Sequence, residues 1–316
     1  MTSPLPTPDR PLRIGTRGSP LALAQAEETR DRLAAAHGIE AACFEIVVIS
    51  VTGDRIQDRP LKDLGGKGLF TREIETSLLD GGIDIAVHSM KDMPTEQPEG
   101  LVIDCFLPRE DVRDVFVSHS FRSLNELPAG SVVGTSSLRR RAQLLSRRPD
   151  LSVVEFRGNV QTRLLKLADG VATGTFLAAA GLNRLEIPDV PANAIAPEDM
   201  LPAIAQGAIG VERRAGDGNT AALLAAIHDV PTALRVTAER AFLWRLDGSC
   251  ETPIAGLAEL DGSSLRLRGE VLRPDGSRVV TGERSGPATD GPEMGDDLAR
   301  DLLDRAGPGF FDWHPA

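Results

Sequence analysis

The residues with the clearest chemical meaning form a basic segment, residues 134–166. It contains eight Arg or Lys and two acidic residues, whereas the whole chain of 316 residues has a formal net charge of −11. A local reversal of charge attracts and holds anionic ligands. Seven of the eight basic residues are Arg, whose planar guanidinium pairs with carboxylate or phosphate through two hydrogen bonds. The segment therefore predicts an anion site.

Arg139 is the most informative member of this segment. It lies at the start of a predicted helix, beside Ser137, a candidate N-cap. The helix dipole is positive there, so a cation is favoured only if an anion lies at that helix end. Arg157 precedes a glycine, and Arg163 lies on the next predicted helix. The simpler interpretation of Arg140, Arg141, Arg147 and Arg148 is a solvated helix face. We expect Arg141, Arg147 and Arg148 to be such ordinary surface residues.

Two loops could also carry charge to a ligand. In the sequence GGKG at 65–68, glycines before a helix let backbone N–H groups approach an anion, and Lys67 adds a positive charge. A flexible solvent loop is an equal alternative. Residues 88–92 follow a predicted strand, where α/β proteins place their sites. There Asp92 could transfer a proton or stabilise a cation, and Lys91 could bind an anion, or the two could be a solvated pair.

Cys250 lies between Gly248 and Pro253, which suggests an ordered loop tip. An accessible thiolate there could be a nucleophile or an attachment point, but a small buried hydrophobic residue is the simpler interpretation of any cysteine. Cys43 and Cys105 fit that simpler interpretation better, because each lies at or in an apolar run. Three widely spaced cysteines indicate neither a disulfide framework nor a CxxC metal site.

The composition, with 41% hydrophobic and 26% charged residues, is that of a soluble globular enzyme. No apolar run approaches the length of a membrane helix, and the first residues lack the apolar core of a signal peptide, so a cytoplasmic protein is expected. The sequence pI near 5.0 and the absence of Tyr argue against a nucleic-acid partner.

The order of apolar segments predicts an α/β fold with parallel sheets. A strand, a Gly-Thr pair and a Ser-capped helix occur twice, at Gly15-Thr16 and Gly134-Thr135, which suggests a weak internal repeat and two similar lobes facing a cleft. The last part of the chain predicts an α+β domain. The predicted strands are 12–17, 44–50, 83–89 and 151–156, together with a strand that leads into a Ser-rich turn at 131–137. Short strands separated by DG-type turns are predicted within 254–262, 264–276 and 278–286, and the predicted helices are 21–37, 69–79, 138–148, 159–170 and 294–307.

These motifs, taken in order, closely resemble those of the porphobilinogen deaminase (hydroxymethylbilane synthase) family over nearly the full length. The matching stretches are 14–26, 65–75, 84–96, 133–144, 156–167, 177–185, 201–212, 234–243 and 248–256. The resemblance implies two periplasmic-binding-protein-like α/β lobes and a smaller C-terminal α+β domain that carries the cofactor cysteine. The implied boundaries are 1–107 with 208–225, 112–201, and 230–316.

The resemblance also implies a monomeric transferase of tetrapyrrole and heme biosynthesis that uses no metal. Such an enzyme links a dipyrromethane cofactor to Cys250 through a thioether, joins four porphobilinogen units with loss of ammonia, and releases hydroxymethylbilane. Asp92 matches the catalytic aspartate that handles the pyrrole nitrogens and the cationic azafulvene intermediates. The cofactor-binding positions are Cys250, Lys91, Asp92, Ser137, Arg139 and Arg140. The substrate-binding positions are Arg17, Ser19, Arg157, Arg163 and Gln206, and the positions on the mobile loop are Lys67 and Phe70.

Some positions depart from the family pattern. A lysine that is common ahead of the glycine pair is Asp63 here, with Lys62 one position earlier. Thr173-Gly174 replaces a common Asp-Ala, and Asn183 replaces a lysine. These changes concern anion contacts at the edge of the site.

Two other functions remain open from the residues. A non-catalytic two-lobed module could bind a small dicarboxylate, and the intact mass would then equal that of the polypeptide. A phosphate-transfer enzyme using the loop at 65–68 would require Mg²⁺, but no paired metal-binding carboxylates support it.

Overall fold

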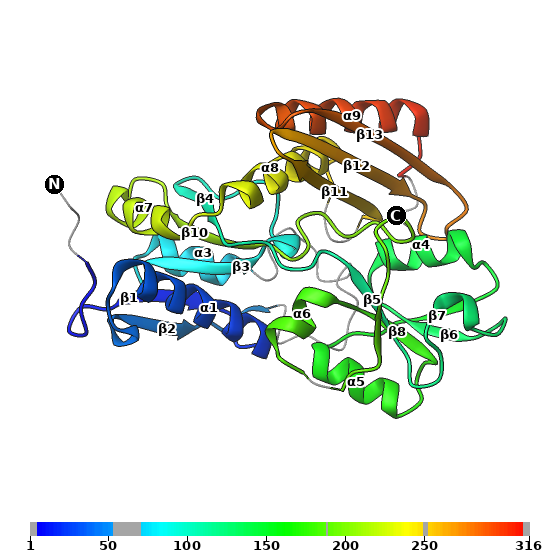
Figure 1. Ribbon diagram of the computed structural model, residues 1–316, viewed down its shortest axis with the longest axis horizontal. Helices are drawn as coiled ribbons and strands as arrows, with labels where there is room; N and C mark the ends of the chain where they lie inside the picture. The colour runs from blue at the N-terminus through cyan, green and yellow to red at the C-terminus, as the bar shows by residue number, and fades with distance from the viewer. Residues whose placement is uncertain (1–4, 53–70, 188, 249–251, 312–316) are drawn as a thin grey trace. The chain divides into compact units, whose positions relative to one another are not determined.

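The computed structural model describes residues 5–52, 71–187, 189–248 and 252–311 (Figure 1). Its strands are β1 Leu12–Thr16, β2 Phe44–Val48, β3 Ile85–Ser89, β4 Leu101–Phe106, β5 Asp114–Val117, β6 Val132–Gly134, β7 Ser152–Val154, β8 Gly174–Ala178, β9 Ala192–Ala194, β10 Ile209–Arg214, β11 Ile254–Asp261, β12 Ser264–Leu272 and β13 Val279–Pro287. Its α-helices are α1 Pro20–His37, α3 Arg72–Leu79, α4 Leu138–Arg147, α5 Val160–Ala168, α6 Ala179–Arg184, α7 Gly218–Leu224, α8 Val230–Arg245 and α9 Gly291–Ala306. The predicted α/β character is confirmed.

The chain divides into two compact units. The first contains Met1–Glu110 and Ala208–Ala233, and the second contains Asp111–Gly207 and Leu234–Ala316. The second unit therefore holds both an α/β lobe and the C-terminal α+β part. The three boundaries expected from the family resemblance stay predictions.

The sheet of the first unit has the strand order β2-β1-β3-β10-β4. The pairs β1–β2 and β1–β3 are parallel, as the sequence predicts. However, β10 lies antiparallel between β3 and β4, so the sheet is mixed where the sequence predicts a parallel one. The antiparallel strand comes from about a hundred residues farther along the chain, which a local β-α-β pattern cannot reveal.

The α/β lobe of the second unit repeats this plan in the order β7-β6-β8-β5-β9. Here β6 is parallel to β7 and β8, and β5 is the antiparallel strand. Gly15 and Gly134 occupy equivalent positions, each paired on both sides by parallel strands. The weak internal repeat is therefore confirmed in the structure.

Helix α1 begins and ends as its sequence predicts. The Ser19 Oγ accepts a hydrogen bond from the Ala22 N–H at 3.3 Å, and Pro20 occupies the first helical turn, where its missing N–H costs nothing. Gly38 ends the helix with φ 63°, a left-handed conformation that glycine adopts without strain. This helix packs on the sheet through Ala26 and Leu33, which are buried with Ile14, Ile85 and Val87.

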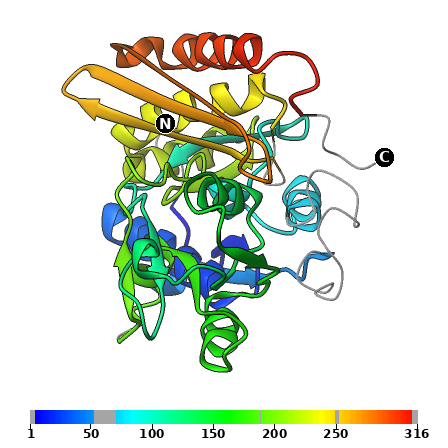
Figure 2. The same ribbon diagram turned by 90° about the vertical axis from the view of Figure 1, so that its right-hand side faces the viewer.

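In the second unit the three-stranded antiparallel sheet β11-β12-β13 is covered by α9 (Figures 1 and 2). Gly295 of α9 lies so close to α8 that an added Cβ would be 2.5 Å from the Ala238 carbonyl oxygen. Within this unit the hairpin of β12 and β13 also contacts α4. A Cβ on Gly276, in the turn of the hairpin, would lie 2.4 Å from the Ser146 nitrogen. Helix α4 is thus held by both the lobe and the C-terminal sheet.

Candidate functional site

A small pocket of about 70 Å³ lies in the first unit, at the carboxyl ends of β1 and β3. Parallel strands of α/β proteins commonly present ligand-binding residues at this edge. We name it the Asp92 pocket. Its polar lining residues are Arg17, Ser19, Gln25, Thr71, His88, Ser89 and Asp92. The structure therefore brings together three of the predicted site residues, Arg17, Ser19 and Asp92.

Asp92 is exposed and belongs to a short 3₁₀ turn, Met90–Asp92, that follows β3. The turn is fixed at its start, because the Met90 N–H donates to the Ala208 carbonyl at 3.0 Å. Gln25 of α1 fixes the preceding residue, with its Nε2 donating to the Ser89 Oγ at 2.8 Å. Gln25 is buried, and sequence reasoning missed it because a glutamine inside an amphipathic helix carries no special signal. Lys91 is half-buried in the same turn.

A buried cluster of one histidine and two glutamates lies beside the pocket. His88 and Glu212 are on the same face of the paired strands β3 and β10, and the His88 Nε2 lies 3.0 Å from the Glu212 Oε2. Glu212 is fully buried, and its second oxygen has no hydrogen-bond partner among the described residues. Glu75 of α3 is also buried and interacts electrostatically with both. Burial, together with the charge of Glu212, raises the pKa of Glu75.

We expect Glu75→Gln to stabilise the protein at neutral pH. A carboxyl group whose pKa is raised by folding reduces stability above that raised value, and the penalty disappears below its unfolded-state value of about 4.3. The free energy of unfolding should rise by on the order of 1 kcal/mol at pH 7 and change little below about pH 4. Urea unfolding at both pH values measures this difference.

Glu73→Gln is the matched control. The Glu73 carboxylate accepts a hydrogen bond from the Thr52 N–H at 2.9 Å, so its neutralisation should lower stability at pH 7. An equal gain from Glu75→Gln at both pH values would contradict the electrostatic explanation.

The basic segment lies in the second unit and is organised by a residue outside it. Asp114, at the start of β5, is fully buried. Its Oδ2 accepts from Arg139 Nη1 at 2.7 Å, and its Oδ1 accepts from Arg140 Nη2 at 2.7 Å and from Gln206 Nε2 at 3.0 Å. Gln143 adjoins this group, with its Oε1 accepting from Arg139 Nη1 at 2.9 Å. We name these five residues the Asp114 cluster.

The anion that the sequence predicts at the start of α4 is present inside the protein. Burial alone would raise the pKa of Asp114, but attraction to Arg139 and Arg140 outweighs it and holds that pKa well below its ordinary range. Arg140, expected on a solvated face or in the anion site, is buried. Sequence reasoning missed Asp114 because it opens an apolar strand 25 residues before Arg139. The only signal was an acidic residue at the edge of the run Asp114–Val117.

The remaining basic residues lie nearer to solvent. Ser137 caps α4, with its Oγ accepting from the Arg140 N–H at 3.4 Å. Arg157 and Arg163 are half-buried near the start of α5, where the Arg163 Nε donates to the Gly158 carbonyl at 2.9 Å. Of the three residues expected at the surface, Arg141 and Arg147 are exposed. Arg148 is partly buried and paired with Asp150 at 2.7 Å, and it also donates to two backbone carbonyls.

Several predicted positions lie outside the described residues. These are the loop at 65–68 with Lys67, the mobile-loop residue Phe70, the departure Asp63 with its neighbour Lys62, and the cofactor cysteine Cys250. Among the described departures, Gly174 lies on β8, where a Cβ would be 2.4 Å from the buried ring of Phe116. Arg184, which follows the departure Asn183 and keeps the family's arginine, donates to the Gly207 carbonyl at 3.1 Å.

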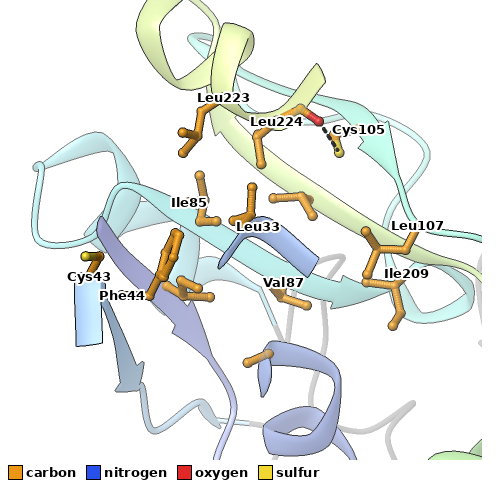
Figure 3. Close-up of a cluster of buried hydrophobic side chains, with 13 residues drawn as sticks. Leu33, Cys43, Phe44, Ile85, Val87, Cys105, Leu107, Ile209, Leu223 and Leu224 are labelled. Carbon is orange, nitrogen blue, oxygen red and sulfur yellow. Dashed lines mark hydrogen bonds between the residues drawn. The ribbon is translucent and has the colours of Figure 1, made fainter. Parts of the chain in front are cut away.

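The other two thiols are core residues, as the sequence predicts. Cys43 and Cys105 are buried in the hydrophobic cluster of the first unit, and the Cys105 Sγ lies 3.5 Å from the Leu224 carbonyl oxygen (Figure 3). Burial, with the nearby charge of Asp104, raises the pKa of Cys105 to about 12. A thiol with that pKa supplies almost no thiolate at neutral pH and is a poor nucleophile. In the described part of the chain, no three His, Cys, Asp or Glu residues gather in a way that could hold a metal ion.

Comparison with known proteins gives consistent results over both units. Residues 12–222 match the family model described as porphobilinogen deaminase, dipyromethane cofactor binding domain, and residues 233–304 match porphobilinogen deaminase, C-terminal domain. A porphobilinogen deaminase of Paracoccus denitrificans is 71% identical over 98% of this chain and 99% of its own length. The chloroplastic porphobilinogen deaminase of Pisum sativum is 55% identical over 95% of this chain and 83% of its own length. A solved structure of a periplasmic substrate-binding protein from Coxiella burnetii is weakly similar, with a TM-score of 0.41 and 15% identity, covering 70% of this chain and 94% of that one.

Proposed function

Because the chain belongs to the porphobilinogen deaminase family, we propose that it is a transferase that joins four porphobilinogen units head to tail. Each addition releases ammonia, and hydrolysis then releases hydroxymethylbilane, an intermediate of tetrapyrrole and heme biosynthesis. The observation that carries the proposal in the structure is the Asp92 pocket. It places an exposed carboxylate together with Arg17 and Ser19 at the ends of parallel strands.

The side chains of this pocket suit a substrate that bears carboxylates and develops positive charge. A guanidinium and a hydroxyl group bind carboxylates through charge-assisted hydrogen bonds, which assigns Arg17 and Ser19 to substrate binding. A fixed carboxylate stabilises a delocalised cation that is held against it, which assigns that role to Asp92. Gln25 and Ser89 keep the turn that bears Asp92 in place. The other proposed substrate-binding residues are Arg157, Arg163 and Gln206, and the family resemblance assigns Lys67 and Phe70 to a mobile loop.

The residues of the matched domain also fit a dipyrromethane cofactor. Such a group presents several carboxylates, and the start of α4 concentrates donors without a competing exposed acid in its first turn. We assign covalent attachment to Cys250 and non-covalent contacts to Lys91, Asp92, Ser137, Arg139 and Arg140. When bound, the cofactor supplies the primer to which substrate units are added.

We assign the protein to the cytoplasm as a monomer that acts on a small molecule, with no nucleic-acid or membrane partner. The acidic composition supports the absence of a nucleic-acid partner. Over the described residues, no helix is both long and apolar enough to span a membrane.

Two measurements on the purified native protein test the proposed function. Its intact mass should exceed the polypeptide mass by one dipyrromethane, and it should convert porphobilinogen to hydroxymethylbilane with release of ammonia. A protein produced with precursor available that has neither the added mass nor the activity would refute the assignment.

A further inference from the structure

The Asp114 cluster has an arrangement that simple anion binding does not require. Arg139 and Arg140 are proposed to bind ligand carboxylates, yet their side chains are only 5% and 6% exposed and both are bound to Asp114. Gln206, a third proposed binding residue, donates to the same carboxylate. Three of the proposed ligand-binding side chains therefore converge on one internal acid.

Without Asp114 the two guanidiniums would not remain in this position. Two like charges buried together repel, and a buried cation without a partner is strongly unfavourable. Each arginine also loses rotamer freedom when it is held in one conformation. A single carboxylate that bonds to both offsets these costs, and the planar geometry of each guanidinium then fixes its orientation.

The cluster is not fully neutralised by direct contacts. One carboxylate pairs with two guanidiniums, and the next acid, Glu270 of β12, is reached only through Gln143, whose Nε2 donates to it at 2.8 Å. The Nε of Arg139 is buried and has no hydrogen-bond partner among the described residues. The directly paired groups therefore retain positive charge and an unused donor, which is the property expected of a site prepared for an anion.

We propose that Asp114 is a positioning residue for cofactor binding, which holds Arg139 and Arg140 in a fixed orientation to receive a ligand carboxylate. This inference rests on the proposed function, because it assumes that the two arginines bind the dipyrromethane. Asp114 itself does not touch the ligand. Its role is to prepare the positive site before binding, so that less ordering is needed when the ligand arrives.

The test is chemical rescue of Asp114→Ala with formate. This substitution removes a carboxylate and leaves a cavity between two guanidiniums, which the formate ion can fill. We expect the fraction of protein carrying the dipyrromethane mass to fall at least about tenfold. Formate during production or reconstitution should restore much of that fraction, while chloride at equal ionic strength should not.

Asp84→Ala is the matched control. Asp84 is also bound by two arginines, Arg13 at 2.9 Å and Arg214 at 3.5 Å, but neither belongs to the proposed site. Asp84→Ala should have lower thermal stability than wild type but the same fraction of protein carrying the dipyrromethane mass. If Asp114 had a purely structural role, the fraction of protein carrying the cofactor would fall in both variants in proportion to their loss of stability. Formate would then change the stability of Asp114→Ala but not that fraction.

A second variant keeps the result decisive. If Asp114→Ala does not fold, Asp114→Asn keeps the shape and should fold with reduced loading. The inference would be overturned if either folded Asp114 variant carried the dipyrromethane mass in the same fraction as wild type. It would also be overturned if formate did not restore that fraction in Asp114→Ala. Failure of the proposed function is recognised separately, because the wild-type protein itself would then carry no added mass.

Discussion

Cys250→Ser is expected to yield a protein whose intact mass equals that of its polypeptide, with turnover of porphobilinogen below about one per cent of wild type. A serine hydroxyl is not ionised at neutral pH, so it cannot replace a thiolate in forming the covalent bond to the cofactor. Without a covalent primer, the growing chain has no attachment to the protein. Electrospray mass spectrometry of the purified variant measures the first effect, and a porphobilinogen assay measures the second.

Cys105→Ala is the appropriate control for this experiment. Its thiol is buried, and its raised pKa of about 12 excludes it as a nucleophile at neutral pH. The control should lose some stability through a cavity in the core and retain the added mass. Added mass on Cys250→Ser, or its loss from Cys105→Ala, would show that the attachment site is assigned to the wrong cysteine.

Asp92→Asn should produce the largest loss of turnover among substitutions that leave the cofactor in place. Asparagine has nearly the same shape as aspartate but carries no charge, so only electrostatic stabilisation and proton exchange are removed. Loss of one preorganised electrostatic group typically reduces turnover by about 10²–10³-fold. Asp92 is exposed, at the end of a fixed turn, so the fold should tolerate the change.

The measurements are turnover of porphobilinogen, intact mass and thermal unfolding of the same preparation. Asp80→Asn, at the exposed end of α3 in the same unit, makes the same change in charge away from the pocket and should retain activity. Turnover of Asp92→Asn close to wild type, with the cofactor present, would mean that the Asp92 carboxylate serves only the structure.

Sequence reasoning succeeded where the signal is local. Ser19, Pro20 and Gly38 predict the bounds of helix α1, because each of them starts or ends the helix through contacts with its neighbours in the chain. The strands of the C-terminal sheet were predicted from short apolar runs separated by turns, and the structure confirms β11, β12 and β13. The position of Asp92 after a strand was sufficient to expect it at the edge of a sheet.

Sequence reasoning failed where two distant segments meet. The antiparallel strand β10 joins a sheet whose other strands lie much earlier in the chain, and β5 pairs with β8 rather than with β6, the next strand in sequence. Asp114 meets Arg139 only because β5 inserts between β8 and β9. The helix dipole favours an anion near Arg139, but a bound ligand and a buried side chain satisfy that requirement equally well.

The sequence by itself determined the two α/β lobes, the α+β C-terminal part and the family, because helix caps, strand periodicity and ordered motifs are local properties of the chain. Only the tertiary structure decided which partner each charged group has. Electrostatic pairing depends on distance in space and on exclusion of water, and neither can be read from spacing along the chain. The basic segment is thus two buried arginines held by Asp114, together with arginines closer to solvent.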